Sequence, residues 1–228
     1  LYAMTYILSV GGSLIVPATG IDINFLKSFR RFVLKRYDAS DRLIIVAGGG
    51  VTARQYVQAA AAVETVPEDD QDWLGIHATR LNAHLLRILL KDVAYPEIIT
   101  NPDKALHTRS RVIVAGGYRP GWSTDYVAVL LANKYKAKTV INLSNIDYVY
   151  NQDPRRYPDA KIIKKINWND FRQIVGNEWH PGLNAPFDPI AARLAQSSRL
   201  RVVILNGRNF VNLNKFFDNK VFKGTIIQ

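Results

Sequence analysis

The chain has 228 residues, of which 48% are hydrophobic and 21% charged, and this balance is typical of a soluble globular protein. Its apolar runs fall well short of the ~20 residues that a membrane-spanning helix requires, which argues against a membrane protein. Thirty Lys and Arg residues against 19 Asp and Glu give a formal net charge of +11, so the protein should attract phosphate groups of small molecules or nucleic acid.

The chain contains no cysteine, which excludes disulfides and thiolate zinc sites and is compatible with a reducing compartment. Residues 1–3 precede the only methionine, Met4, and we interpret them as a remnant of protein expression rather than a secretory leader. We therefore expect a cytoplasmic protein. The Lys and Arg residues are dispersed, without a dense basic arm, so neither nucleic acid nor a membrane is an expected partner.

In chain order, five apolar stretches of strand length end at glycine or at small polar residues. They are residues 6–10, 43–47, 112–115, 139–143 and 202–205. Unbroken apolar strands are typical of a buried parallel sheet.

Between these strands, apolar residues recur at helical spacing. They are Phe25, Leu26, Phe29, Phe32 and Val33 after an N-cap at Asp22, then Leu74, Leu81, Leu85 and Leu89, then Val127, Leu130 and Leu131. The alternation predicts an α/β fold, a three-layer αβα sandwich with a mainly parallel central sheet, with ligands beyond the carboxyl ends of its strands. No linker divides the chain, so we expect one domain over residues 1–228, and residues 145–166 read as a hairpin or excursion over the site.

Glycines follow three of the predicted strands, at Gly11-Gly12, at Gly48-Gly49-Gly50 and at Gly116-Gly117. A glycine-rich turn from a strand into a helix exposes successive N–H groups and directs the positive end of the helix at an anion. No run matches a P-loop or the dinucleotide-binding glycine spacing. Each run alone can also be read as a tight turn, but three in consecutive strands favour a phosphate site.

Seven segments carry a resemblance to a known family. In chain order they are SVGGSLI, VAGGGVTARQY, DWLGIHATRLNAHLL, GGYRPGWSTDYVAVLLA, SNIDYVYNQDPRRYPDAKII, FDPIAARLA and GTII. Their order is that of the amino acid kinase superfamily, and the third and fourth segments resemble its archaeal-type uridylate (UMP) kinases most specifically. The resemblance implies transfer of a phosphoryl group from ATP to UMP in pyrimidine nucleotide synthesis, Mg²⁺ carried with ATP and no metal ion held by the protein alone, and a homo-oligomer, hexameric in relatives.

The resemblance also implies roles for individual residues. For ATP binding these are Gly11, Gly12, Ser13, Gly50, Arg54, Ser144, Asn145, Tyr150 and Asp153. For UMP binding they are Gly49, Asp72, Asn82, Tyr118, Arg119, Pro120, Gly121, Trp122, Ser123 and Thr124. The implied catalytic residues are Asp125, Lys161 and Arg54, which suits phosphoryl transfer because that reaction needs alignment and neutralisation of charge more than a nucleophilic side chain.

The sequence departs from the resemblance at three positions. Ser9 stands where many superfamily members have a lysine, although the archaeal UMP branch also lacks it, and Arg54, Arg80 and Arg119 are candidates to supply the missing charge. Trp122 replaces a histidine usual in the branch, and Tyr148 replaces a glycine.

Several residues and the function itself have alternative readings. Arg80 and Arg119 can equally form structural ion pairs, and Asp72 and Asp188 can each cap a helix instead of meeting ribose or phosphate. Three other functions remain open: another small-molecule kinase of the superfamily, a non-catalytic nucleotide or oxyanion binder like its molybdenum storage members, and a basic nucleic-acid-binding regulator.

Overall fold

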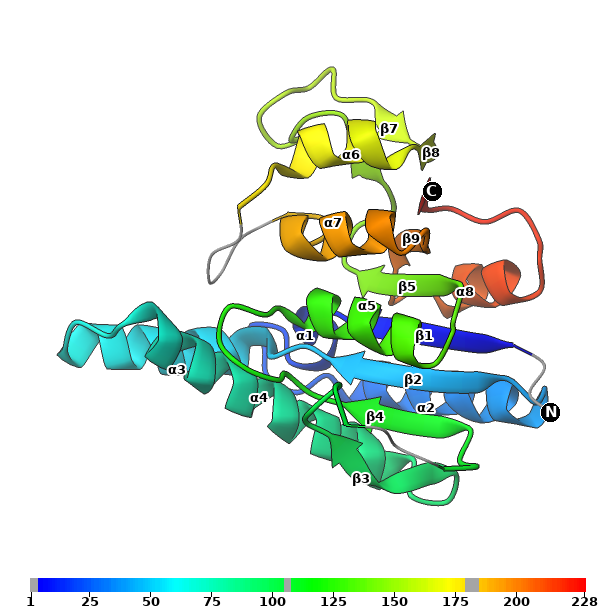
Figure 1. The fold of residues 1–228 in the computed structure, drawn as a ribbon, viewed down its shortest axis with the longest axis horizontal. Helices are drawn as coiled ribbons and strands as arrows, with labels where there is room; N and C mark the ends of the chain where they lie inside the picture. The colour runs from blue at the N-terminus through cyan, green and yellow to red at the C-terminus, as the bar shows by residue number, and fades with distance from the viewer. Residues whose placement is uncertain (1–3, 105–107, 179–184) are drawn as a thin grey trace.

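The computed structural model describes residues 4–104, 108–178 and 185–228, so the interpretation of residues 1–3 lies outside the described residues. Its centre is an eight-stranded sheet (Figure 1). In spatial order the strands are β3 (Ala94–Ile99), β4 (Val112–Ala115), β2 (Arg42–Ala47), β1 (Thr5–Val10), β5 (Thr139–Ser144), β9 (Arg201–Asn206), β10 (Thr225–Ile227) and β8 (Lys165–Ile166).

The first six strands of this order are parallel, and β10 pairs antiparallel with β9. All five strands predicted from the sequence are confirmed, each to within one residue at either end. The mainly parallel sheet brings the carboxyl ends of β1, β2, β4, β5 and β9 to one edge, where the glycine loops begin.

Helices cover both faces of the sheet, because successive strand residues point to opposite faces and both sets are apolar. On one face, Leu8 and Ile45 pack with α1 (Gly12–Ile15), α2 (Ile23–Asp38) and α8 (Phe210–Phe217). On the other face, Ile7 and Ile44 pack with α5 (Thr124–Lys134), α6 (Trp168–Val175) and α7 (Pro189–Ser197). The predicted three-layer αβα sandwich is confirmed. The predicted cap of α2 is confirmed too, since the Asp22 carboxylate accepts a 2.8 Å hydrogen bond from the Phe25 N–H.

Two helices form an arm that extends beyond the sheet, at the left of Figure 1. They are α3 (Gly50–Val63) and α4 (Glu68–Leu89). Gly50 is the residue that α3 buries, whereas the second half of α4 packs against the sheet through Ala83 and Leu86. None of the helices in the described ranges is long and apolar enough to cross a membrane.

The predicted apolar face of α4 is confirmed only in part. Leu85 and Leu89 are partly buried against the core as predicted, but Leu81 is 64% exposed. The residues that α4 buries include Ile76, Thr79, Asn82 and Leu86. Two of these residues are polar because they hydrogen-bond to loops, so a search for apolar residues selects a rotated face. The reading of Asp72 as a helix cap is also wrong, because α4 begins at Glu68 and Asp72 lies inside it.

The predicted hairpin within residues 145–166 is confirmed. In it, β6 (Val149–Tyr150) pairs antiparallel with β7 (Ile162–Ile163). The hairpin lies at the top of Figure 1, next to α6. Its position over the site stays a prediction.

The α4 correction predicts a contrast between two leucines on the same helix. Leu86 is 1% exposed, so Leu86→Ala should lower the free energy of unfolding by about 2–5 kcal/mol through lost burial and the cavity left behind. Leu81→Ala should change it by less than about 0.5 kcal/mol. Urea denaturation of both variants measures this, and equal losses would contradict the orientation of α4.

Candidate active site

The glycine loops after β1 and β2 pack backbone against backbone. A Cβ atom on Gly12 would lie 1.9 Å from the Gly50 nitrogen, and a Cβ atom on Gly48 would lie 2.4 Å from the Gly12 nitrogen. Gly50 has φ +68°, a conformation that favours glycine, and begins α3. Any side chain at Gly12 or Gly50 would therefore push the two loops apart.

Helix α4 ties these loops to the loop after β4. The Asn82 amide donates to the carbonyl oxygens of Gly48 (2.8 Å) and Gly49 (3.1 Å). One turn earlier, the Thr79 hydroxyl accepts a 2.6 Å bond from the Gly117 N–H. Asn82 is buried behind the glycine loop, so the structure gives it a supporting position rather than one on a cavity wall.

Two charged residues of α4 hold the same β4 loop further out. Arg80 donates to the carbonyl oxygens of Gly117 (3.1 Å) and Tyr118 (2.9 Å), and Asp72 accepts a 2.7 Å bond from the Gly121 N–H. Burial raises the pKa of Asp72 and lowers that of Arg80. Arg80 therefore bonds to carbonyl oxygens rather than to a carboxylate, and its guanidinium lies 5.9 Å from the centroid of the Trp73 ring.

A cavity of about 740 Å³ opens between the loops and the α3–α4 arm. Among the residues predicted as ligand contacts, its walls include Gly12, Gly49, Gly50, Arg54, Asp72, Trp122, Ser123 and Thr124. The positive end of α3 and the Arg54 guanidinium suit the cavity to a phosphate group, although the Val51 N–H of that first turn already donates to the Val16 carbonyl oxygen at 2.9 Å.

Sequence reasoning missed several wall residues. They are Gly48, Ala53, Val57, Gln58, Gln71, Gly75, Ile76, Thr79 and Gly117. The signal that could have found them is helical spacing, since most lie one, three, four or seven positions from Arg54 on α3 or from Asp72 on α4.

An aromatic cluster lies at the end of the cavity formed by the loop after β4. The Trp122 ring contacts those of Tyr126 and Tyr118 edge to face, with centroids 4.7 Å and 5.3 Å apart. The Arg119 guanidinium lies 3.8 Å from the centroid of the same ring. Trp122 is therefore fixed by its neighbours, and Arg119, Tyr118, Pro120 and Gly121 surround it without belonging to the cavity wall.

Asp125 lies in a polar network beneath the cavity. Its Oδ1 atom accepts hydrogen bonds from the Ser9 hydroxyl (2.7 Å) and the Asn142 amide (2.8 Å), and its Oδ2 atom faces the Asp188 N–H at 3.4 Å. Burial raises the pKa of Asp125 to about 6; the bond from Ser9 opposes this rise and the charge of Asp188 adds to it. Ser9 thus places a neutral hydroxyl at the position where the sequence departs from the lysine of many superfamily members.

Asp188 caps α7, as one of its two readings predicted. Its Oδ1 atom accepts from the N–H groups of Ile190 (2.6 Å) and Ala191 (3.1 Å). Its other oxygen accepts a hydrogen bond from the Ser123 hydroxyl, and Ser123 itself caps α5. The two capping residues link α5 and α7 at the wall of the cavity.

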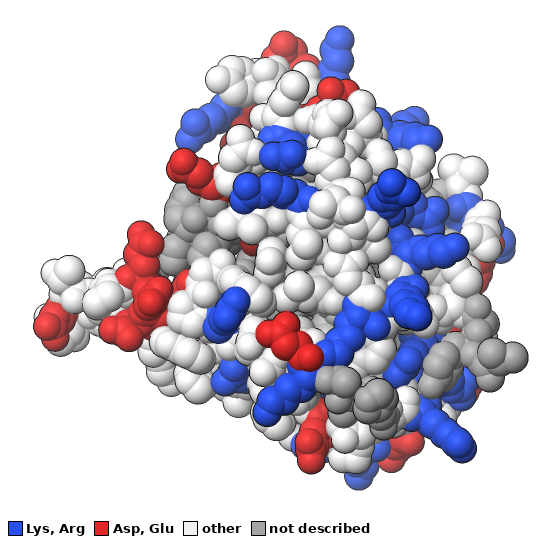
Figure 2. All heavy atoms as spheres, in the orientation of Figure 1, with Lys and Arg blue, Asp and Glu red and all other residues white. Residues whose placement is uncertain are grey.

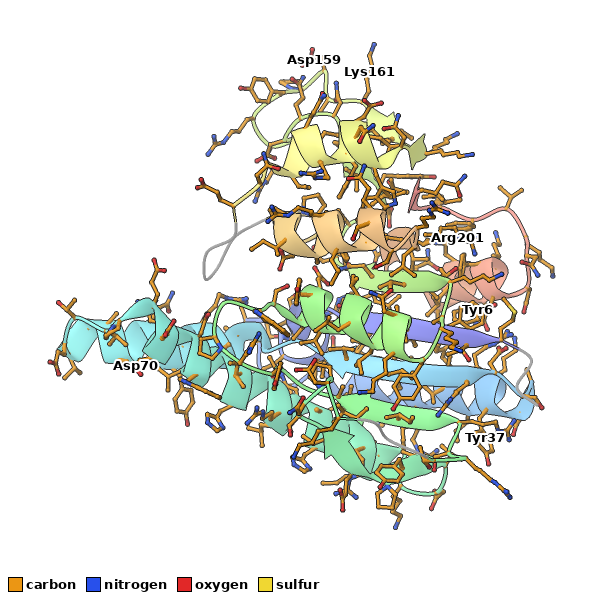
Figure 3. All side chains as sticks on the ribbon, in the orientation of Figure 1. Tyr6, Tyr37, Asp70, Asp159, Lys161 and Arg201 are labelled. Atoms are coloured by element: carbon orange, nitrogen blue, oxygen red, sulfur yellow. The ribbon has the colours of Figure 1, made fainter. Side chains whose placement is uncertain are left out.

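The remaining predicted residues are not brought to this cavity. Gly11 and Ser13 flank Gly12, Ser144 is the last residue of β5, and Asn145 follows it at the same edge of the sheet. Tyr150 belongs to β6, the Asp153 carboxylate accepts two bonds from the Arg155 side chain, and Lys161 is exposed. Figure 3 shows Lys161 at the outer end of the hairpin, directed away from the body of the protein.

No group of three or more His, Asp or Glu residues able to hold a metal ion is found in the described ranges. Asp125 and Asp188 are neighbours beside the cavity, since the Asp125 Oδ2 atom accepts from the Asp188 N–H at 3.4 Å. Mg²⁺ is commonly held by one or two carboxylates together with substrate phosphates and water, so this donor set fits an ion that arrives with a nucleotide.

The fold and the cavity define an α/β protein with an anion-directed pocket at the carboxyl edge of a parallel sheet. The sequence pattern of the amino acid kinase family matches residues 4–206, and the chain belongs to this family.

Similar proteins extend this match along nearly the whole chain. The uridylate kinase of Methanospirillum hungatei is 36% identical over 98% of this chain and 94% of its own length, and that of Pyrococcus abyssi is 34% identical over 99% and 100%. The crystal structure of uridylate kinase from Archaeoglobus fulgidus superimposes with a TM-score of 0.81 at 29% identity, covering 99% of this chain and 100% of that one.

The raised pKa of Asp125 predicts a pH-dependent cost to stability. The cost is absent below the ordinary pKa of 3.8, grows as the pH rises from there to about 6, and is constant above, because in that window the unfolded chain has ionised the carboxyl while the folded state still holds its proton. Asp125→Asn removes the titration, so the unfolding free energy of the variant relative to the native protein should rise between about pH 4 and about pH 6.5 and then level off. We expect about 1–2 kcal/mol, since part of the residue still reaches solvent.

Denaturant titrations across this pH range measure the difference. Asp70→Asn, at an exposed carboxylate of α4, is the control for loss of a charge and should show no such trend. A difference for Asp125→Asn that stays constant with pH would contradict the burial of an ionised carboxylate.

Proposed function

We propose that the chain is an ATP:UMP phosphotransferase that forms UDP, acting as one amino acid kinase domain. The observation that carries the proposal is the cavity between two interlocked glycine loops, in a chain that uridylate kinases match from end to end. The archaeal relative of known structure supports the same assignment.

The reaction needs two phosphate groups held in line. In our proposal the N–H groups around Gly12 and Gly50, with Arg54, bind the ATP phosphates, and Gly49 meets the UMP phosphate. The attacking oxygen belongs to the UMP phosphate and is already anionic, so no general base is required. Mg²⁺, when bound with ATP, would neutralise phosphate charge, and Asp125 would help to hold it.

The acceptor is proposed to bind along α4 and the loop after β4. Asp72 would receive the ribose with the carboxylate oxygen that does not hold Gly121, and Trp122 would bound the space for the base. Because α4 also holds the loops after β2 and β4, the acceptor site and the phosphate site would keep a fixed position relative to each other.

The proposed donor residues of the hairpin lie further away. For Lys161 to reach the transferring phosphoryl group, the hairpin would have to move toward the cavity, and its role stays a prediction, as do those of Ser144, Asn145, Tyr150 and Asp153 on adenosine. A homo-oligomer, hexameric as the resemblance implies, and a cytoplasmic location also stay predictions.

ADP formation by the purified protein with Mg²⁺-ATP tests the proposal directly. The acceptor panel contains UMP, CMP, carbamate, acetylglutamate and isopentenyl phosphate, and we expect turnover with UMP. Arg54→Ala should lower kcat/KM by about tenfold to a hundredfold, the cost of a charge-assisted hydrogen bond to phosphate.

Arg31→Ala is the matched control, because Arg31 is exposed on α2 and donates to Ser28. It should leave kcat/KM unchanged. Turnover with a non-nucleotide acceptor alone would point to another kinase of the family. Saturable ATP binding without turnover on any acceptor would point to a non-catalytic binder.

A further inference from the structure

The positive charge of the chain does not collect at the candidate active site. Arg54 is the cation on the described cavity wall, and the nearby arm carries exposed Glu64, Glu68, Asp69 and Asp70. Figure 2 shows acidic residues on the arm at the left and Lys and Arg gathered along the right flank, where the strands of Figure 1 begin. The net charge therefore has no explanation in the proposed reaction.

We propose that this flank, the amino-terminal edge of the sheet, binds the phosphodiester backbone of a nucleic acid. We call it the basic edge and define it by six residues in the turns and strand starts of β4, β2, β5 and β9: Arg111, Arg42, Lys136, Lys138, Arg199 and Arg201. Four separate segments supply them, which is why the sequence shows only dispersed cations.

The strand register sets the spacing of these cations. Arg42 pairs with Thr5 and lies level with Arg111, whose carbonyl oxygen accepts from the Leu43 N–H. Arg201 pairs with Thr139 and lies one residue further along, level with Leu43 and on the opposite face of the sheet. From β4 to β9 the row crosses four inter-strand steps of about 4.8 Å, or about 19 Å in all. One strand of B-form DNA places five or six phosphates over about that length.

Aromatic rings orient two of the guanidinium groups. Arg111 lies 3.9 Å from the centroid of the Tyr37 ring and donates to the Tyr37 carbonyl oxygen at 2.9 Å, and Arg42 lies 4.8 Å from the centroid of the Tyr135 ring. Fixed guanidinium planes lose less freedom when they bind a phosphate.

Two of the turns place a cation in a strained backbone conformation. Lys136 and Arg199 each have φ +53°, at turns after α5 and α7 where glycine is favoured. The negative end of a helix attracts a cation and can account for these two positions. It does not account for Lys138, Arg111 or Arg201, which stand at or beside the starts of strands.

The chemistry of the basic edge favours nucleic acid over a protein partner. Protein interfaces are apolar at their centre and depleted in Lys, whereas nucleic-acid interfaces are polar and strongly positive. In the described part of the chain, Met4 is the large hydrophobic side chain that is exposed beside these strand starts, so the basic edge has little apolar surface for a protein partner. The Asp41 carboxylate at this edge is buried and bound by Arg36. Three exposed carboxylates subtract in part from the positive field: Asp38, Asp92, which pairs with Arg30, and Asp218, which pairs with Arg36.

The test compares two triple variants with the same net charge. The edge variant is Lys136→Glu, Lys138→Glu and Arg199→Glu, and the control is Lys27→Glu, Lys164→Glu and Lys165→Glu, all at exposed positions. The probe is a short fluorescein-labelled DNA duplex, and fluorescence anisotropy gives Kd between about 50 mM and about 200 mM salt. Turnover of UMP by the edge variant, equal to that of the native protein, shows that it is folded.

The native protein should bind with a Kd that rises steeply with salt. The edge variant should lose affinity at least tenfold, with a salt slope shallower by about 3, and the control should change less than threefold. Equal losses in both variants would mean that only net charge matters and would overturn the proposal. So would absence of binding at about 50 mM salt, or displacement of DNA by polyglutamate at equal charge concentration.

Discussion

The contact between the backbones of Gly12 and Gly50 is the constraint on which the site depends. Two parallel strands end side by side, and their loops can meet only because neither carries a side chain at the point of contact. The contact fixes the start of α3, and α3 in turn forms one wall of the cavity. The amide of Asn82 then fastens the second loop to α4, which carries the other wall.

Polar residues of α4 also fix the loop after β4, where the acceptor is proposed to bind. Thr79, Arg80 and Asp72 bond to successive parts of the loop after β4, so one helix holds the walls of both proposed substrate sites. Beneath them, Ser9 and Asn142 hold Asp125 without a counter-charge, which leaves a carboxylate whose pKa is raised to about 6. A cation arriving with ATP would stabilise the ionised form.

The sequence predicted the strands and layers well, because their apolar runs are unambiguous and parallel sheets bury both faces. On α4 it wrongly included Leu81 in the buried face and missed Thr79 and Asn82, which are buried for hydrogen bonding that no periodicity reveals. It identified Arg54, Asp72 and Trp122 through family resemblance, and the structure brings them to one cavity. Lys161 could not be placed from sequence, because a hairpin's position depends on tertiary contacts rather than on its own residues.

The measurement that tests the central claim most directly is a comparison of Gly12→Ala with Gly75→Ala. A Cβ atom at Gly75 would meet nothing within 4 Å, so that variant should keep its free energy of unfolding or gain up to about 1 kcal/mol. Gly12→Ala should lower the free energy of unfolding by about 3 kcal/mol or more, several times the effect of a typical surface substitution. The variant should also lose phosphorylation of UMP. A Gly12→Ala protein with native stability and turnover would contradict the account.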